Sequence, residues 1–239
     1  MTYRNNNILA IVPARSGSKG IHKKNIAKLK GIPLLGYVGN LLKELSFIDY
    51  SFLSTDSVEF QSVGIRYGIS CPSLRPKHLA SDTALSIDVW IHAWNYVENM
   101  LNKKFDISIL LEPTSPFRRA SDIKQSIDLL IDSNSDSLVT VSKNSSQFSP
   151  EKTFLISDDN CLKKYINNDI DYSIRQLIPN YYHKNGICYA AKRKTILEEK
   201  NIINLNTYAL EISRPVINID DPIDLEIADF LLTKYEKSS

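Results

Sequence analysis

The segment Ile8–Pro13 (ILAIVP) is apolar at every position, and Ile107–Leu111 (ISILL) comes close to the same pattern. Apolar runs of this length, in which polar and apolar residues do not alternate, are typical of strands buried on both faces of a parallel sheet. Such a sheet needs helices on both of its faces. These two segments therefore predict an α/β fold.

Helical patterns alternate with further strand-like segments over most of the chain. Pro33 suits the start of a helix, and Trp90 and Trp94 lie on the apolar face of a longer one. Strands are predicted at 8–13, 50–54, near Ile69, 107–111, 137–141, 186–191 and 216–219. Helices are predicted at 33–45, 57–67, 84–101, 121–132, 194–200 and 222–235. This alternation predicts right-handed crossovers and a doubly wound, mostly parallel, Rossmann-like sheet.

The alternation stops between about residues 143 and 184, where the chain is rich in Asn, Ser and Lys. A hairpin is predicted at 153–165, around the turn Asp158–Asn160. We interpret 143–184 as an insertion that leaves the main sheet, and residues 1–239 as a single domain.

Charge is unevenly distributed along the chain. The first 43 residues hold eight cations and no acid, while the remainder has six more acids than cations. Seven of the eight glycines also precede residue 70. This predicts an anion-binding segment near the N-terminus. A nucleic-acid partner is not expected, because such binders are more often basic throughout.

Membrane and secreted classes are disfavoured as well. No apolar run approaches the roughly 18 residues of a membrane span, and the first residues lack the pattern of a secretory signal. The three cysteines, Cys71, Cys161 and Cys188, are an odd number without paired spacing. We therefore expect a cytoplasmic protein with reduced thiols and no membrane partner.

The segment 13–26 (PARSGSKGIHKKNI) directly follows the first predicted strand. It therefore lies at the carboxyl edge of the sheet, where α/β proteins bind ligands. Gly17 and Gly20 allow backbone N–H groups to approach a polyanion, and Arg15, Lys19 and Lys24 can supply charge-assisted hydrogen bonds. The segment matches neither the Walker A pattern nor GxGxxG. It predicts a triphosphate site of a different kind.

Six blocks, in order along the chain, then carry a family resemblance: VPARSGSKGIHKKNIAKLKGIPLLGY, STD at 54–56, RPKHLASDTALSIDVWIHA, LLEPTSPFRRASDI, the stretch from Arg175-Gln176 to Asn185-Gly186, and INIDDPIDLEIAD. Together they resemble the CMP-sialic acid synthetase family, the acylneuraminate cytidylyltransferases, which includes legionaminic-type members. The resemblance implies a nucleotidyltransferase fold. It also implies transfer of CMP from CTP to the anomeric hydroxyl of a nonulosonic acid, with release of pyrophosphate.

The resemblance also assigns roles by position. Catalytic roles fall to Arg15, Lys19 and Lys24 on the phosphates, to Asp220, and to Arg175. The positions implied to bind the nucleotide are Ala14, Arg15, Gly17, Ser18, Asn25, Arg75, Ser81, Asp82 and Thr83. The positions implied to bind the sugar acid are Glu112, Arg175, Gln176 and Asn185. The insertion is expected to form a homodimer, with Arg175 reaching the partner's active site.

Asp220 matches the family's metal-ligating aspartate. It follows the predicted strand 216–219 and can therefore project toward the predicted triphosphate site at the carboxyl edge of the sheet. Mg²⁺ suits one or two carboxylates together with phosphate oxygens. Our hypothesis is that Asp220 holds Mg²⁺, which lowers the pKa of the attacking hydroxyl.

Two residues depart from the family pattern. Glu112 stands where sialic acid synthetases commonly have glutamine, and Asn218 stands where many have a first aspartate. The negative charge of Glu112 disfavours binding of a substrate that carries a carboxylate. This holds unless a cation or a substrate amine offsets the charge, or unless Glu112 joins the metal site. The alternatives are therefore CMP transfer to a shorter 2-keto-3-deoxy sugar acid, or a non-catalytic nucleotide-binding regulator.

Overall fold

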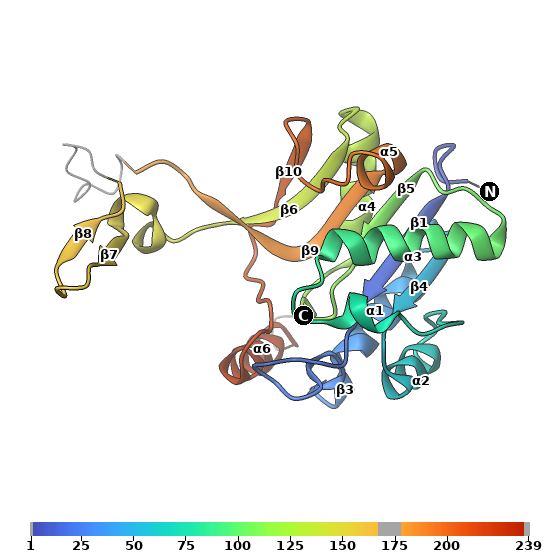
Figure 1. Ribbon diagram of the computed structural model, residues 1–239, viewed down its shortest axis with the longest axis horizontal. Coiled ribbons are helices and arrows are strands. Elements are labelled where there is room, and N and C mark those ends of the chain that lie inside the picture. The colour runs from blue at the N-terminus through green and yellow to red at the C-terminus, as the bar shows by residue number, and fades with distance from the viewer. Residues whose placement is uncertain (1, 167–177, 237–239) are drawn as a thin grey trace.

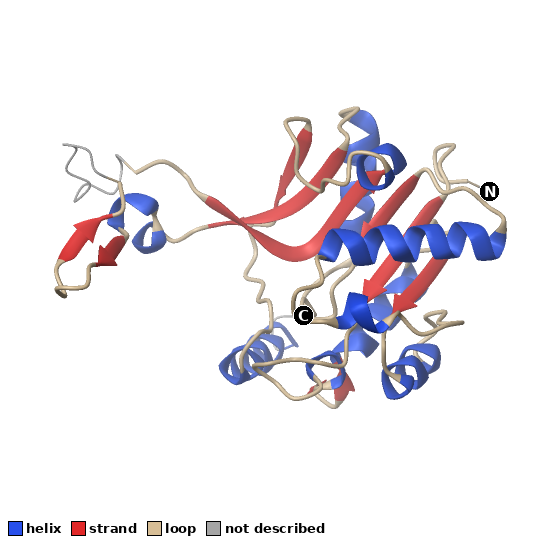
Figure 2. Cartoon of the chain, viewed as in Figure 1, coloured by secondary structure: helices blue, strands red, loops and turns tan. Residues whose placement is uncertain are grey.

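The computed structural model describes residues 2–166 and 178–236, and its centre is a six-stranded sheet in the order β10-β6-β9-β5-β1-β4 (Figures 1 and 2). The strands are β1 (Ile8–Pro13), β4 (Tyr50–Ser54), β5 (Ile107–Leu110), β6 (Ser137–Lys143), β9 (Tyr182–Lys192) and β10 (Thr207–Glu211). Within this six-stranded sheet, every described pairing is parallel except those of β9 with β5 and β6. The predicted mostly parallel α/β sheet is confirmed.

Helices cover both faces of this sheet. They are α1 (Leu34–Glu44), α2 (Val58–Arg66), α3 (Ser86–Leu101), α4 (Ala120–Asp132) and α5 (Arg193–Leu197), while α6 (Pro222–Glu236) packs apart from the sheet in a cluster with Leu29 and Ile219. Short 3₁₀ turns occur at Lys24–Ile26, Lys77–Ala80, Ser146–Phe148 and Pro150–Lys152. The helix predictions are confirmed to within a few residues.

Strand β1 explains why its sequence is apolar throughout. Ile8, Ala10 and Val12 pack in one cluster with α1 and α4, while Leu9 and Ile11 pack in another with α3. All five side chains are fully buried. Successive side chains of a strand point to opposite faces, so a strand covered on both sides has no polar position to spare.

The insertion forms an arm that extends away from the sheet on the continuations of β6 and β9 (Figure 1). Its tip carries the predicted hairpin, formed by β7 (Phe154–Ile156) and β8 (Leu162–Lys164). Several large apolar side chains of the arm are exposed, namely those of Phe148, Phe154, Leu155, Ile156, Leu162 and Tyr165.

Two strand predictions are wrong. Near Ile69 there is a single bridge, between Phe52 and Ser70, rather than a strand. The last strand is β10 and not 216–219, which runs as an extended loop. Ile219 is apolar because it is fully buried against the cluster under α6, and its N–H bonds to the carbonyl of Thr114 at 2.8 Å.

A second small hairpin, β2 (Lys28–Leu29) with β3 (Ile32–Pro33), leads into α1. Its turn uses Gly31 at a φ of +79°, a conformation that favours glycine. Among the described residues, none of the helices combines the length and the hydropathy that crossing a membrane requires.

Candidate functional site

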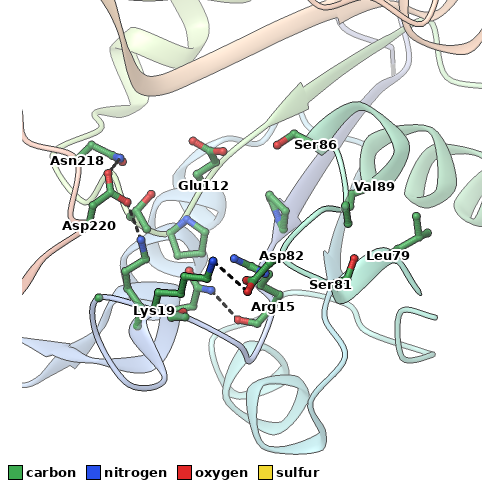
Figure 3. Close-up of a pocket in the computed structure, with 18 of the residues that line it drawn as sticks. Arg15, Lys19, Leu79, Ser81, Asp82, Ser86, Val89, Glu112, Asn218 and Asp220 are labelled. Atoms are coloured by element: carbon green, nitrogen blue, oxygen red, sulfur yellow. Dashed lines mark hydrogen bonds and ion pairs between the residues drawn. The ribbon is translucent and has the colours of Figure 1, made fainter. Parts of the chain in front are cut away.

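A pocket of about 510 Å³ opens beside the carboxyl ends of β1 and β5 (Figure 3). Four segments far apart in the sequence form its wall: the loop after β1, the turn before α3, the residues that follow β5, and residues 218–221. The predicted site residues that line it are Arg15, Ser18, Lys19, Lys24, Asn25, Arg75, Ser81, Asp82, Glu112 and Asp220. The fold therefore gathers most of the predicted site in one place.

The cation-rich loop after β1 is anchored at both of its ends. Asp56, directly after β4, accepts hydrogen bonds from the N–H of Ser16 at 2.8 Å and from its hydroxyl at 2.6 Å. Asn25, which is 6% exposed, donates to the carbonyl of Arg15 at 3.0 Å. Asn25 thus shapes the loop, and Asp56 is a positioning residue for which no role was predicted.

Gly20 sits against the backbone of Asp220 and the side chain of Asp221. A Cβ at this position would overlap the carbonyl oxygen of Asp220 and would lie 2.8 Å from Oδ1 of Asp221. The absence of a side chain at Gly20 is therefore what lets the loop approach residues 220–221 closely.

Carboxylates of the pocket pair with the loop cations. Arg15 lies 2.7 Å from Oδ1 of Asp82, and Lys19 lies 3.3 Å from Oδ2 (Figure 3). Hydrogen bonds from Arg15 and then Lys19 lower the pKa of Asp82. An incoming polyanion would have to replace this carboxylate as the partner of both cations.

Asp220 is held in a similar way on the opposite side of the pocket. Lys24 Nζ lies 2.7 Å from Oδ1, and Asn218 Nδ2 donates to Oδ2 at 2.8 Å. The side chain of Asp220 is 63% exposed. The N–H groups of Asp220 and Asp221 both donate to Asp224 Oδ2 at 2.9 Å, so Asp224 caps α6.

The residues present fit a divalent cation bound mainly by its substrate. Within residues 2–166 and 178–236, no three His, Cys, Asp or Glu side chains come together as a set of metal ligands. Asp220 does offer an exposed carboxylate at the pocket wall. Mg²⁺ usually takes one or two protein carboxylates and completes its shell with phosphate oxygens and water, which agrees with this arrangement.

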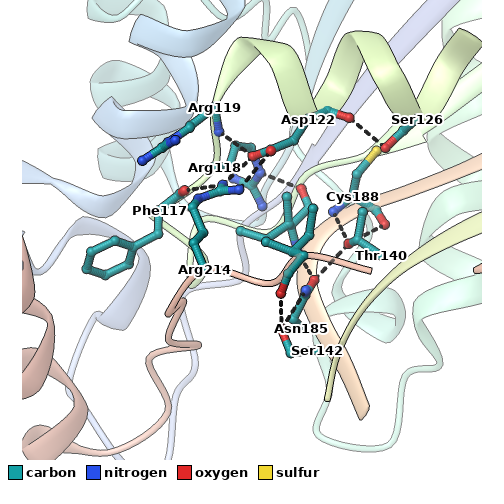
Figure 4. Close-up of polar contacts among 12 residues, drawn as sticks. Phe117, Arg118, Arg119, Asp122, Ser126, Thr140, Ser142, Asn185, Cys188 and Arg214 are labelled. Carbon is teal, nitrogen blue, oxygen red and sulfur yellow. Dashed lines mark hydrogen bonds and ion pairs between the residues drawn. The ribbon is translucent and has the colours of Figure 1, made fainter. Parts of the chain in front are cut away.

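Glu112 lines the pocket at the end of β5, above the buried Arg118. The guanidinium of Arg118 donates to the carbonyls of Glu112 at 2.9 Å, Gly186 at 2.8 Å and Ile187 at 2.6 Å. Burial raises the pKa of Glu112, and burial lowers the pKa of Arg118 to about 10. Arg118 thus joins the residues after β5 to β9 beneath the pocket, next to the ion pair that Arg214 forms with Asp122 (Figure 4).

Arg75 is also buried, at 6% exposure, and its side chain faces the backbone. It donates to the hydroxyl of Ser54 at 2.9 Å and to the carbonyl of Leu79 at 3.2 Å. Burial lowers its pKa to about 10. Arg75 therefore holds the turn before α3 against the end of β4.

The remaining predicted site residues do not line the pocket. Ala14 is buried and donates its N–H to the carbonyl of Ser54 at 2.9 Å, and neither Gly17 nor Thr83 is part of the pocket wall. Asn185 is buried and bonds to Thr140 at 2.7 Å. Arg175 and Gln176 lie outside the described residues.

Residues 9–216 match the family model described as "Cytidylyltransferase". The chain is 32% identical to the CMP-N,N'-diacetyllegionaminic acid synthase of Legionella pneumophila over 94% of this chain and 96% of the relative. It is 30% identical to the pseudaminic acid cytidylyltransferase of Campylobacter jejuni over 97% of this chain and 98% of the relative. A solved CMP:2-keto-3-deoxy-manno-octonic acid synthetase in complex with CTP superposes with a TM-score of 0.71 at 16% identity, covering 96% of this chain and 99% of that one.

Proposed function

The chain belongs to the cytidylyltransferase family, and we propose that it transfers CMP from CTP to the anomeric hydroxyl of a nonulosonic acid, releasing pyrophosphate. The observation that carries the proposal is the pocket in which Arg15, Lys19 and Lys24 converge at the carboxyl edge of the sheet. Two relatives named for such sugar acids are 30% or more identical over nearly the whole chain.

The residues of the pocket suit nucleotidyl transfer, because this reaction depends on positioning and on neutralising charge more than on a protein nucleophile. Arg15, Lys19 and Lys24 bind the triphosphate, and Asn25 keeps their loop in place. Asp220 would hold Mg²⁺, which when bound would supply Lewis-acid polarisation of the phosphate and of the attacking hydroxyl. In this proposal Arg75, Ser81 and Asp82 form the wall at the nucleotide end of the pocket.

Glu112 marks the sugar end of the pocket in this proposal. It lines the same pocket as Asp82 and Asp220, and all three side chains are labelled in Figure 3. A nine-carbon sialic, legionaminic or pseudaminic type of acid is favoured by the names of the relatives that match over the whole chain. The structural likeness to the octonic acid synthetase, at 16% identity, supports the fold alone.

We further propose a homodimer built on the arm of residues 143–184. The arm exposes apolar side chains at its tip, among them Ile156 at 72% and Leu162 at 68%, which an isolated chain leaves in water. On the family resemblance alone, Arg175, which lies outside the described residues, is proposed to reach the partner's active site in this assembly. We also propose a cytoplasmic location, with which the free thiols of Cys71, Cys161 and Cys188 agree.

The test is release of pyrophosphate from CTP in the presence of Mg²⁺ and a panel of sugar acids. The panel contains sialic, legionaminic and pseudaminic acids and one eight-carbon 2-keto-3-deoxy acid. We expect turnover with at least one nine-carbon acid and formation of its CMP ester. Turnover with the eight-carbon acid alone would show that the substrate is a shorter 2-keto-3-deoxy acid. CTP binding without turnover on any acid would favour a non-catalytic nucleotide-binding regulator.

A further inference from the structure

Both oxygens of the Asp220 carboxylate are already engaged by donors from the protein itself. Lys24 Nζ lies 2.7 Å from Oδ1, and the amide of Asn218 donates to Oδ2 at 2.8 Å. The side chain of Lys24 is only 18% exposed, so its ammonium group is held close to Asp220 rather than free in solvent. A divalent cation approaching Asp220 in this state meets the positive charge of Lys24.

The amide of Asn218 is fixed in this orientation by a buried partner. Ser115 is fully buried, and its hydroxyl donates to Oδ1 of Asn218 at 2.9 Å, which turns the Nδ2 group toward Asp220. Gly186, at a φ of +72°, covers the pair, and a Cβ there would overlap Ser115 Oγ and lie 3.3 Å from Asn218 Oδ1. Asn218 therefore offers Asp220 a hydrogen-bond donor and adds no negative charge for a cation.

We propose that Lys24 occupies Asp220 in the nucleotide-free protein, and that the divalent cation enters together with the triphosphate, which takes Lys24 away from Asp220. The proposal rests on the proposed function. Lys24 lines the same pocket as Arg15 and Lys19, so its ammonium can pass from a carboxylate oxygen to a phosphate oxygen. Oδ1 then becomes available as a metal ligand, while Asn218 continues to orient Oδ2.

This exchange couples the two ligands thermodynamically. If CTP raises the affinity of the protein for the cation by removing Lys24 from Asp220, the cation must raise the affinity for CTP by the same factor. The coupling is specific to Lys24, since Lys19 pairs with Asp82 at 3.3 Å and Asp82 keeps Arg15 as a second partner. Lys19 therefore provides a matched control.

The test measures Mn²⁺ binding to nucleotide-free protein from the electron paramagnetic resonance signal of free Mn²⁺, with no sugar acid and no turnover. We expect weak binding to the wild-type protein. Lys24→Met should bind Mn²⁺ roughly three- to tenfold more tightly, because an ion pair that competes with the cation is gone. Asn218→Asp, which adds a carboxylate, should gain on the order of tenfold. Lys19→Met should match the wild type.

Increased affinity cannot arise from misfolding, which would weaken the site, and circular dichroism checks each variant. Wild-type Mn²⁺ affinity that is the same with and without CTP would overturn the inference. So would Lys24→Met protein that binds Mn²⁺ no better than the wild type. Calorimetry with CTP separates a failure of this inference from a failure of the proposed function. A wild-type protein that does not bind CTP would refute the proposed function.

Discussion

Glu98, at the end of α3, is the most heavily hydrogen-bonded carboxylate in the described part of the fold. It is 3% exposed and accepts from Trp94 Nε1 at 3.1 Å, from the N–H of Phe105 at 3.0 Å and from Lys104 at 2.9 Å. Arg193 at the start of α5 donates to both of its oxygens at 3.1 Å. One carboxylate thus ties α3, the entry to β5 and α5 together.

Burial by itself would raise the pKa of Glu98, but the hydrogen bonds from Arg193, Phe105 and Lys104 outweigh it and lower the pKa from 4.5 to about 2. A carboxyl whose pKa is lower in the folded state stabilises the fold above its unfolded pKa and loses that contribution as the pH falls toward the folded value. At pH 7 the contribution is about 3 kcal/mol, and at pH 3 about 1 kcal/mol remains.

We therefore expect Glu98→Gln to lower the free energy of unfolding by about 3 kcal/mol at pH 7, because it removes the charge and leaves Arg193 unpaired. The difference from the wild type should shrink by about 2 kcal/mol between pH 7 and pH 3. Urea unfolding followed by tryptophan fluorescence at both pH values measures it. Lys104→Gln, which removes an exposed partner, should cost less than about 1 kcal/mol. A Glu98→Gln effect that is independent of pH would refute the reasoning.

Two further predictions concern the pocket, and a third concerns the packing of Gly186 against Ser115. Arg15→Ala and Asp220→Ala should each reduce turnover at least about tenfold with unchanged unfolding curves, because charge stabilisation is lost; full Mg²⁺-dependent activity in Asp220→Ala would remove it from the metal site. Glu112→Gln should change the ranking of kcat/KM among the sugar acids, and an unchanged ranking would place Glu112 outside the sugar site. Gly186→Ala should cost about 1–3 kcal/mol in urea unfolding, since it meets Ser115 at a positive φ; a wild-type midpoint would contradict this.

The parts of the fold that the sequence predicts well are those where local pattern and burial agree. Strand β1 is apolar because both of its faces are covered, and α2 begins where Ser57 accepts the N–H of Phe60 at 3.3 Å. The antiparallel direction of β9 has no corresponding signature in the sequence. A central strand is buried on both faces whether it runs parallel or antiparallel, so apolar content alone does not reveal its direction.

The strand error at the C-terminal end has a similar cause. β10 lies at the edge of the sheet, and of its five residues Leu210 alone is buried, so its sequence lacks a strand-like apolar run. Residues 216–219 carry that run because Val216, Ile217 and Ile219 pack against the cluster beneath α6. Burial and strand formation therefore diverge at this end of the chain.

The sequence predicts the anion-binding loop of the site, but it does not predict the hydrogen bonds that support the site from other segments. Glycines and cations after a buried strand indicate an anion site from the sequence alone, and Arg15 and Lys24 line the pocket as expected. The role of Arg118 depends on carbonyls 68 and 69 residues away along the chain. Nothing in its own neighbourhood in the sequence indicates that contact, which only the antiparallel docking of β9 beside β5 creates.

The acidic side chains of the pocket wall offset its cations, so the pocket as a whole does not strongly attract anions. Its wall carries four basic side chains, Arg15, Lys19, Lys24 and Arg75, and four acidic ones, Asp82, Glu112, Asp220 and Asp221. With formal charges in balance, a triphosphate carrying about four negative charges gains little from long-range attraction unless a divalent cation accompanies it. The departures at 112 and 218 preserve this balance, since a carboxylate gained at Glu112 offsets the one lacking at Asn218. They shift negative charge from residues 218–220 to the residue after β5, where burial raises the pKa of Glu112.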